Sequence, residues 1–269
     1  MLGHLLVATV TVVFIALGFW QLSRHGQLLE RNARIEARLA EVPRPYQQLV
    51  EGLDPDALPG AEEDGRDRPV TISGVFHPEH EVLLRNRAYE ERPGFHVLTP
   101  LEPTQALPNQ PEGSWVLVNR GWIPFQYDDP NLPSWNAPEG EVQISGWLLP
   151  EADDPEGPLA MFAPRDPAEG ALERVARPDV DRLAAQMPAP LATFLVTAGT
   201  LTTADGVSRS AATLGTDGWV VLPVLLETPE AEGGPHLSYA LQWWSFALIT
   251  IIGYAFLLRR RDEPTTTPN

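Results

Sequence analysis

Two uncharged apolar runs, one near each end of the chain, most constrain how this sequence can fold. Residues 5–22 (LLVATVTVVFIALGFWQL) and 239–258 (YALQWWSFALITIIGYAFLL) contain no charged side chain. As helices rising 1.5 Å per residue they would span about 27 and 30 Å, which matches the hydrocarbon thickness of a bilayer. The sequence therefore predicts transmembrane helices at 1–22 and 239–258, a domain at 23–238 between them, and a tail at 259–269.

A cleaved signal peptide is the alternative for the first run, and a buried core helix is the alternative for the second. The first run is longer than the apolar part of a signal peptide, and the text that follows it, SRHG, offers no A-x-A cleavage site. The second run has the length of a span and stops at three consecutive arginines. Both alternatives are weaker than the transmembrane interpretation.

Arginine placement predicts the orientation. Arg259, Arg260 and Arg261 follow the second run and favour a cytoplasmic C-terminus. Two spans then place the N-terminus in the cytoplasm too, and the 23–238 domain outside the plasma membrane. The arginines after the first run favour the opposite orientation. Acidic residues among them reduce the local positive charge, however, and long domains translocate largely regardless of charge. Because the start, MLGH, lacks a basic flank, we also expect the native start to lie upstream of Met1.

The region between the runs is predicted to be an α+β domain dominated by antiparallel strands. A helix is expected at 23–42, ending at Pro43, and a short one at 179–186. Apolar and β-branched runs bounded by Gly, Pro, Asn and Asp predict strands between them. The expected strands are 70–76, 81–86, 95–101, 115–119, 142–149, 194–200 and 219–226.

Composition excludes several classes of function. The 269 residues carry 36 acids against 19 basic residues, all of them arginine, for a net charge of -17. An acidic chain does not suit nucleic acid, whose phosphates need basic surface. Cysteine is absent, which excludes disulfides, thiolate metal sites and covalent haem attachment through Cys. Nucleotide-binding, protease and hydrolase motifs are also missing from the sequence, so we expect a protein that is not an enzyme.

Four phrases, in order along the chain, resemble one known family. They are LGFWQLSR (17–24), RPGFHVLTPL (92–101), VLVNRGWIP (116–124) and HLSYALQWWSFA (236–247). Together with two spans around one domain, they are similar to the surfeit locus protein 1 (Shy-type) family of cytochrome c oxidase assembly factors. The resemblance implies binding of haem a and its delivery to oxidase subunit I. Partners implied with it are subunit I, the haem a synthesis enzyme and the lipid bilayer.

The same resemblance implies that His236 is the haem-linked histidine, at the outer end of the second span. At 100° per residue, one face of that helix carries an imidazole, aromatic rings and small residues, which would suit haem. That face consists of His236, Tyr239, Ala240, Trp243, Ala247, Thr250 and Tyr254. The alternative is that His236 caps the helix and that the face packs against the first span.

Four more residues, expected at the same depth in the membrane as His236, complete the predicted site. Gln21 and Gln242 are amides that could pair across the two helices. Arg24 could bind a haem propionate or extend to water. Trp20 could line the haem pocket or anchor the helix at the membrane interface. Together with His236, Tyr239 and Trp243, these are the predicted cofactor-binding residues, with His236 as the tentative ligand of the haem iron.

The remaining candidates have simpler interpretations. His77, Glu79, His80 and Glu81 (HPEHE) contain metal-ligand types, but Pro78 favours a polar turn. His96 is expected to be structural. Arg85, Arg87 and Arg120 are expected to pair with acids. The alternative function is a scaffold that holds oxidase assembly intermediates without a cofactor.

Overall fold

The computed structural model describes residues 1–53, 65–127, 134–149, 164–210, 221–228 and 233–261. The chain forms two compact units. The first comprises Met1–Glu36 and Glu230–Asn269, and the second comprises Ala37–Pro229.

The first unit is a pair of long helices, α1 (Leu2–Leu39) and α5 (His236–Arg261). Both are long and apolar enough to cross a membrane, and only 6% of each apolar window is buried. The first predicted span and the helix expected at 23–42 form one continuous helix. The reason lies in the sequence, because 2–39 contains no proline and Pro43 is the first residue that would break the helix.

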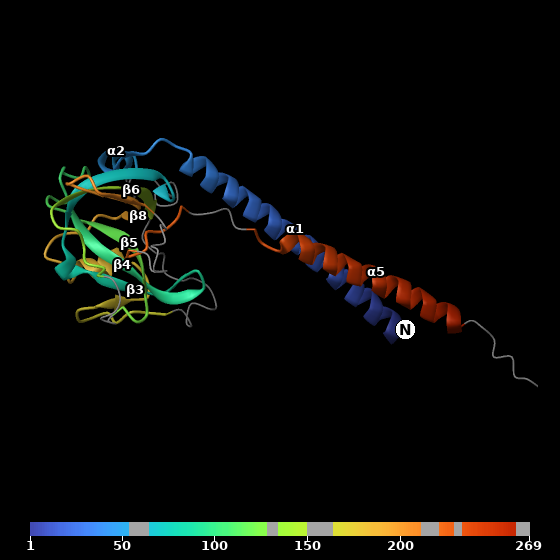
Figure 1. Cartoon of the computed structure of the whole chain (residues 1–269). Helices are drawn as coiled ribbons and strands as arrows, with labels where there is room; N and C mark the ends of the chain where they lie inside the picture. The colour runs from blue at the N-terminus through green and yellow to red at the C-terminus, as the bar shows by residue number, and fades with distance from the viewer. Residues whose placement is uncertain (54–64, 128–133, 150–163, 211–220, 229–232, 262–269) are drawn as a thin grey trace, which may run out of the picture. The chain divides into compact units, whose positions relative to one another are not determined.

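Close contacts join α1 and α5, which lie alongside each other in Figure 1. Gly18 is buried, and a Cβ at that position would lie 2.1 Å from Nε1 of Trp244. Phe14 packs on Trp243 with ring centroids 5.6 Å apart, and Phe19 meets Trp244 at 5.5 Å. Small residues that admit a large neighbour are typical of helix contacts in membranes.

The second unit is built mainly from strands. Its helices are α2 (Tyr46–Glu51), the short 3₁₀ helix η1 (Pro78–His80) and α4 (Val180–Ala184). Its strands are β1 (Arg44–Pro45), β2 (Pro69–Phe76), β3 (Val82–Tyr89), β4 (Arg92–Pro103), β5 (Val116–Pro124), β6 (Glu141–Leu149), β7 (Arg174–Val175), β8 (Leu195–Thr203) and β9 (Ser208–Ser210).

Five of the strands close into a barrel. The order around it is β2-β6-β8-β5-β4, and β2 pairs with β4 to complete the ring. The pairings in the ring are antiparallel except that of β5 with β8. Strands β3 and β7 extend the sheet beyond β4, while β1 and β9 add short pairings to β2 and β8. A closed ring leaves few unpaired strand edges.

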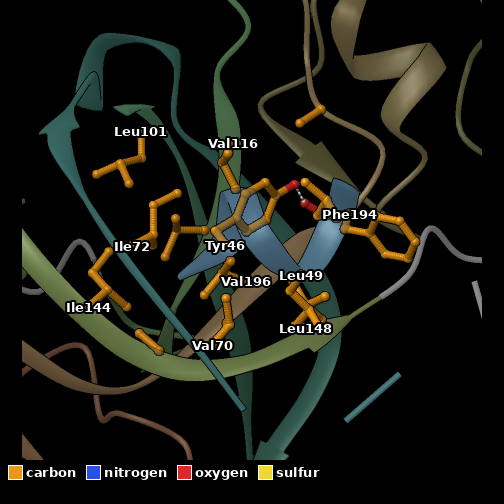
Figure 2. Close-up of a cluster of buried hydrophobic side chains, with 14 of the residues drawn as sticks. Tyr46, Leu49, Val70, Ile72, Leu101, Val116, Ile144, Leu148, Phe194 and Val196 are labelled. Carbon is orange, nitrogen blue, oxygen red and sulfur yellow. Dashed lines mark hydrogen bonds between the residues drawn. The ribbon is translucent and has the colours of Figure 1, made fainter. Parts of the chain in front are cut away.

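Tyr46 occupies the centre of the barrel's main core (Figure 2). Its ring is 1% exposed among Val70, Val116 and Val196, and its hydroxyl donates to the carbonyl of Phe194 at 2.8 Å. Burial raises the pKa of Tyr46, although the hydrogen bond to Phe194 acts in the opposite direction. One side chain therefore ties α2 to the chain just before β8.

The predicted α+β class with two apolar helices around a sheet-rich domain is confirmed. Six of the seven expected strands are present at similar bounds, and the 179–186 helix appears as α4, capped by Asp179. Helix α2 and the short strands β1, β7 and β9 were not predicted from the sequence.

The strand expected at 219–226 is wrong over 221–226, where only an isolated bridge joins Val224 to Trp122. Pro223 has no N–H to donate to a ladder, and Nη2 of Arg209 lies against the carbonyls of 221–223. Residues 219–220 and the tail after Arg261 lie outside the described residues.

Tyr46→Phe should lower the free energy of unfolding by about 2 kcal/mol, because it leaves the buried Phe194 carbonyl without its donor. Tyr89→Phe is the matched control, since Tyr89 is half-exposed, and should cost less than about 0.5 kcal/mol. Chemical unfolding of the full chain in detergent, followed by tryptophan fluorescence, measures both. Equal effects of the two substitutions would contradict a special role for the Tyr46 hydroxyl.

Gly18→Ala should destabilise the helix pair by about 1–3 kcal/mol, because the new methyl group overlaps the Trp244 indole. Gly26→Ala in the same helix meets nothing within 4 Å. That control should be neutral or stabilising by up to about 1 kcal/mol, since alanine favours helix over glycine. Thermal unfolding in detergent compares the two, and a stabilised Gly18→Ala protein would disprove the contact.

Candidate functional site

His236 and Gln21 meet where α5 begins. Nδ1 of His236 lies 2.9 Å from Oε1 of Gln21. An amide oxygen only accepts hydrogen bonds, so Nδ1 carries the proton and donates it. The lone pair of the imidazole is then on Nε2, the arrangement in which a histidine with an orienting partner binds a metal. The two residues are 215 positions apart in the sequence, and both are half-buried.

Gly234 borders the Nε2 edge of the same imidazole. A Cβ built on Gly234 would lie 2.8 Å from Cδ2 and 3.1 Å from Nε2 of His236, and 2.8 Å from Cδ2 of Leu28. Any larger residue would press on the nitrogen that carries the lone pair. Glycine at this position therefore keeps that edge of His236 free of a neighbouring side chain.

The other predicted site residues divide into two groups. Trp20 and Tyr239 are 55% and 47% exposed, so both side chains are accessible. Gln242 is exposed as well, and Arg24 donates from Nη1 to Oε1 of Gln27 at 3.0 Å. Trp243, in contrast, packs against Phe14 of α1. Of the seven, the structure joins His236 and Gln21 directly.

The predicted helix face largely contacts α1. Ala240 and Ala247 are 0% and 4% exposed, and Trp243 packs on Phe14. At the other end of the pair, the Tyr254 hydroxyl hydrogen-bonds Nδ1 of His4. The face thus serves helix packing, and His236, where α5 begins, keeps one nitrogen that Gln21 does not use.

His25 is a site candidate that the sequence analysis missed. Gln21, His25 and Leu28 recur at helical spacing on one face of α1, and the first and last of them approach the start of α5. Nδ1 of His25 is buried and has no hydrogen-bond partner among the described residues. The sequence signal that could have identified His25 is its position four residues after Gln21, one helical turn along the same face. A buried imidazole nitrogen with no described partner, on the same face of α1 as Gln21, makes His25 a candidate ligand.

His96 in the barrel has the structural role expected for it. Nδ2 of Asn119 donates to Nδ1 of His96 at 3.1 Å, and Oδ1 of Asn119 accepts from the Gly121 amide at 3.1 Å. Burial, with a smaller contribution from the charge of Arg87, lowers the pKa of His96 to about 4. The ring is therefore neutral near pH 7 and links β4 to β5.

The HPEHE segment forms a turn, as expected. Its 3₁₀ helix places Nδ1 of His77 3.1 Å from Glu79 and Nε2 3.1 Å from Glu102. The His77 ring stacks on Trp115 at 4.0 Å and 6°. In the described parts of the chain no three His, Asp or Glu side chains gather closely enough to hold a metal ion.

Two of the three arginines form ion pairs. Arg120, 2% exposed, donates to Glu81 at 2.5 Å and to the Thr99 hydroxyl at 2.7 Å. Arg85 pairs with Asp166 at 2.7 Å. These contacts account for Arg85 on β3 and Arg120 on β5 without an acidic ligand.

Comparisons with known proteins point to one family. The model of the SURF1 family matches residues 8–248. A SURF1-like protein of Mycobacterium tuberculosis is 28% identical, over 99% of this chain and 89% of the relative. A SURF1-like protein of Rickettsia conorii is 24% identical, over 96% and 91%. Human surfeit locus protein 1 is 27% identical, over 52% of this chain and 46% of the human protein.

The neutral state of His96 predicts a pH dependence of stability. The unfolded chain binds a proton at His96 below about pH 6.5, whereas the folded chain does so only near pH 4. The free energy of unfolding should therefore fall as the pH drops through this window, by up to about 3 kcal/mol from this residue. His96→Gln should remove that part of the slope in denaturant unfolding at pH 7 to 4. An unchanged slope, or an NMR titration of His96 near pH 6.5, would contradict the burial.

Proposed function

Because the chain belongs to the SURF1 family, we propose that it is a membrane-anchored assembly factor for cytochrome c oxidase. In this proposal it binds haem a near the outer membrane surface and aids its delivery to oxidase subunit I. The role is binding and transfer, not catalysis. Both termini lie in the cytoplasm of the cell, and the barrel lies outside the plasma membrane.

The hydrogen bond from His236 to Gln21 is the observation that carries the haem proposal. It fixes the ring orientation and leaves Nε2 as the metal-binding nitrogen. Bound haem a would supply an iron that this nitrogen could ligate. Gly234 places no side chain against Nε2, and a second imidazole, His25, lies on the same side of α1 as Gln21.

The exposed residues around His236 would hold the macrocycle. Trp20 and Tyr239 offer aromatic surfaces, and Gln242 an amide. Arg24 is exposed and donates to Gln27 on its own helix, so its guanidinium could exchange Gln27 for a propionate. Trp243 would support the site from within the helix contact. Docking of subunit I, and of the haem a synthesis enzyme, would then bring donor and acceptor to this end of the helix pair.

A scaffold without a cofactor is the second candidate. The observation that favours it is the packing of the α5 face on α1, which fills the space between the helices with side chains. In that case the hydrogen bond between His236 and Gln21 would hold the two helices together, and neither residue would bind a cofactor. The two functions make opposite predictions about the purified protein.

The full-length protein should be purified from a host that makes haem a, and its visible spectrum recorded. We expect bound haem in the parent and its loss in His236→Ala. Gln21→Leu should weaken binding about 10- to 100-fold, the usual effect of removing an orienting partner, while Gln21→Glu, which retains an acceptor for Nδ1, should keep the haem bound. His4→Ala removes an imidazole at the opposite end of the same helix pair and should keep the haem.

No haem in a correctly inserted parent would favour the cofactor-free scaffold. Equal haem in the parent and in His236→Ala would remove His236 from the site. Equal losses in His4→Ala and His236→Ala would indicate that helix pairing, not ligation, retains the haem.

A further inference from the structure

Arg87 on β3 is a half-buried cation without an acidic partner among the described residues. Its hydrogen bond there runs from Nη1 to the carbonyl of the neighbouring Asn86 and is long, at 3.5 Å. Burial lowers the pKa of Arg87, and no carboxylate in the described chain acts against that effect. A guanidinium carries several N–H donors, so most of those on Arg87 are left for an acceptor from outside the described chain.

Strand register places His96 beside this cation. Arg87 lies opposite Gly94 in the pairing of β3 with β4, and His96 follows two residues after Gly94. Directly opposed residues share a face of the sheet, as do residues two apart along a strand. Arg87 and His96 are therefore diagonal neighbours on one face. The positive charge of Arg87 adds to the larger effect of burial in lowering the pKa of His96, which agrees with this placement.

Asn119 determines which nitrogen of His96 can donate. Its Oδ1 accepts from the Gly121 amide, so its Nδ2 faces Nδ1 of His96 and donates to it at 3.1 Å. The proton of the neutral imidazole is then on Nε2. Among the described residues, the fully buried side-chain atoms without a partner are Nδ1 of His25 and Nε of Arg85. Nε2 of His96 is not one of them and has no acceptor there, so its N–H reaches solvent.

Two aromatic rings border the two donors. Trp122 lies opposite His96 in the pairing of β4 with β5, and its indole fills the space beside Gly94, where a Cβ would lie 2.5 Å from Nε1. The same Nε1 donates to the carbonyl of Arg87 at 3.4 Å. Tyr89 packs against the indole with ring centroids 5.7 Å apart. The indole thus holds the main chain of Arg87 in place beside His96.

The chemistry of the two donors matches a single carboxylate. The arginine fork fits the planar carboxylate group, and one of its oxygens could also accept from Nε2–H of His96. Because His96 is neutral near pH 7, the pair supplies one positive charge. Burial and the negative charges of Glu90 and Glu227 raise the pKa of Tyr89 on the same face. Acids therefore lie nearby, and they would repel a doubly charged phosphate.

We propose that Arg87 and His96 form a binding site for one carboxylate group, which we call the carboxylate site. The guanidinium of Arg87 and Nε2–H of His96 would both donate to its oxygens. The group belongs either to a small organic acid or to an acidic side chain of a partner protein, and the test below separates the two. The proposal is independent of haem binding, because the site lies wholly within the barrel unit.

The test follows the His96 resonances by NMR in the full chain, labelled at histidine and held in detergent at pH 7.5. The small probes are acetate and its uncharged counterpart acetamide. The peptide probes are end-capped tripeptides with a central glutamate or glutamine between glycines. We expect saturable shifts of the His96 resonances with acetate and the glutamate peptide, and none with the two amides. Tighter binding of the peptide than of acetate would assign the site to a partner protein, and otherwise to a small acid.

Three outcomes of the titrations would overturn the proposal. They are no shift with either carboxylate, equal shifts with the amides, and tighter binding of inorganic phosphate than of both carboxylates. The absorbance of haem plays no part in these titrations, so they succeed or fail independently of the haem proposal.

Substitutions at Arg87 locate the binding. Arg87→Gln should weaken it about 10- to 100-fold, as expected for the loss of hydrogen bonds from a charged group. Arg174→Gln is the matched control, because it also removes one arginine charge but lies against Phe95, whose side chain is on the opposite face from His96. That variant should bind like the parent. Equal affinity in both variants would refute the site. If Arg87→Gln does not fold, Arg87→Lys, which keeps the charge but loses the fork, should still weaken binding, and unchanged affinity would refute the site.

Discussion

The pairing of β2 with both β6 and β4 is the constraint on which the barrel depends. It closes five strands into a ring, and the closure forces two backbones together at Gly74, where a Cβ would lie 2.2 Å from the Glu102 carbonyl oxygen. Glycine is the residue that allows so close an approach at a barrel corner. The same closure surrounds the core that holds Tyr46, because Val70, Val116 and Val196 come from three of the five strands in the ring.

The association of α1 with α5 depends on close packing and on polar contacts at both ends of the pair. Between two apolar helices in lipid there is little hydrophobic drive to associate, so close packing and polar contacts decide the arrangement. Gly18 supplies the close packing under Trp244, and the polar contacts lie at opposite ends, His236 with Gln21 and His4 with Tyr254. A half-buried imidazole is costly to place near lipid unless it has a partner. The Gln21 amide provides that partner and, in doing so, sets which nitrogen of His236 is left for a ligand.

Much of this could be read from the sequence, and the misses have physical causes. Long apolar runs and period-two strands are strong local signals, so both helices and the main strands were predicted. The six-residue α2 is too short to show periodicity, and Pro45 before it suggested a loop. Closure of β2 on β4 is a long-range register that no local pattern encodes. Span lengths placed Gln21, Gln242 and His236 at one depth in the membrane. The rotation of each helix about its axis follows from the contact at Gly18, so the sequence paired Gln21 with Gln242, whereas the structure pairs it with His236.

The choice of an amide as the partner of His236 matters for the transfer that we propose. A carboxylate hydrogen-bonded to Nδ1 would orient the ring and also raise the basicity of Nε2, which strengthens its bond to a metal. It would also bring a negative charge to a region of low dielectric, where an unpaired charge is expensive. The Gln21 amide orients the same ring, carries no net charge, and raises the basicity of Nε2 less than a carboxylate would. An imidazole held in this way combines a fixed direction with a moderate metal bond, which suits a site that must both accept a cofactor and release it.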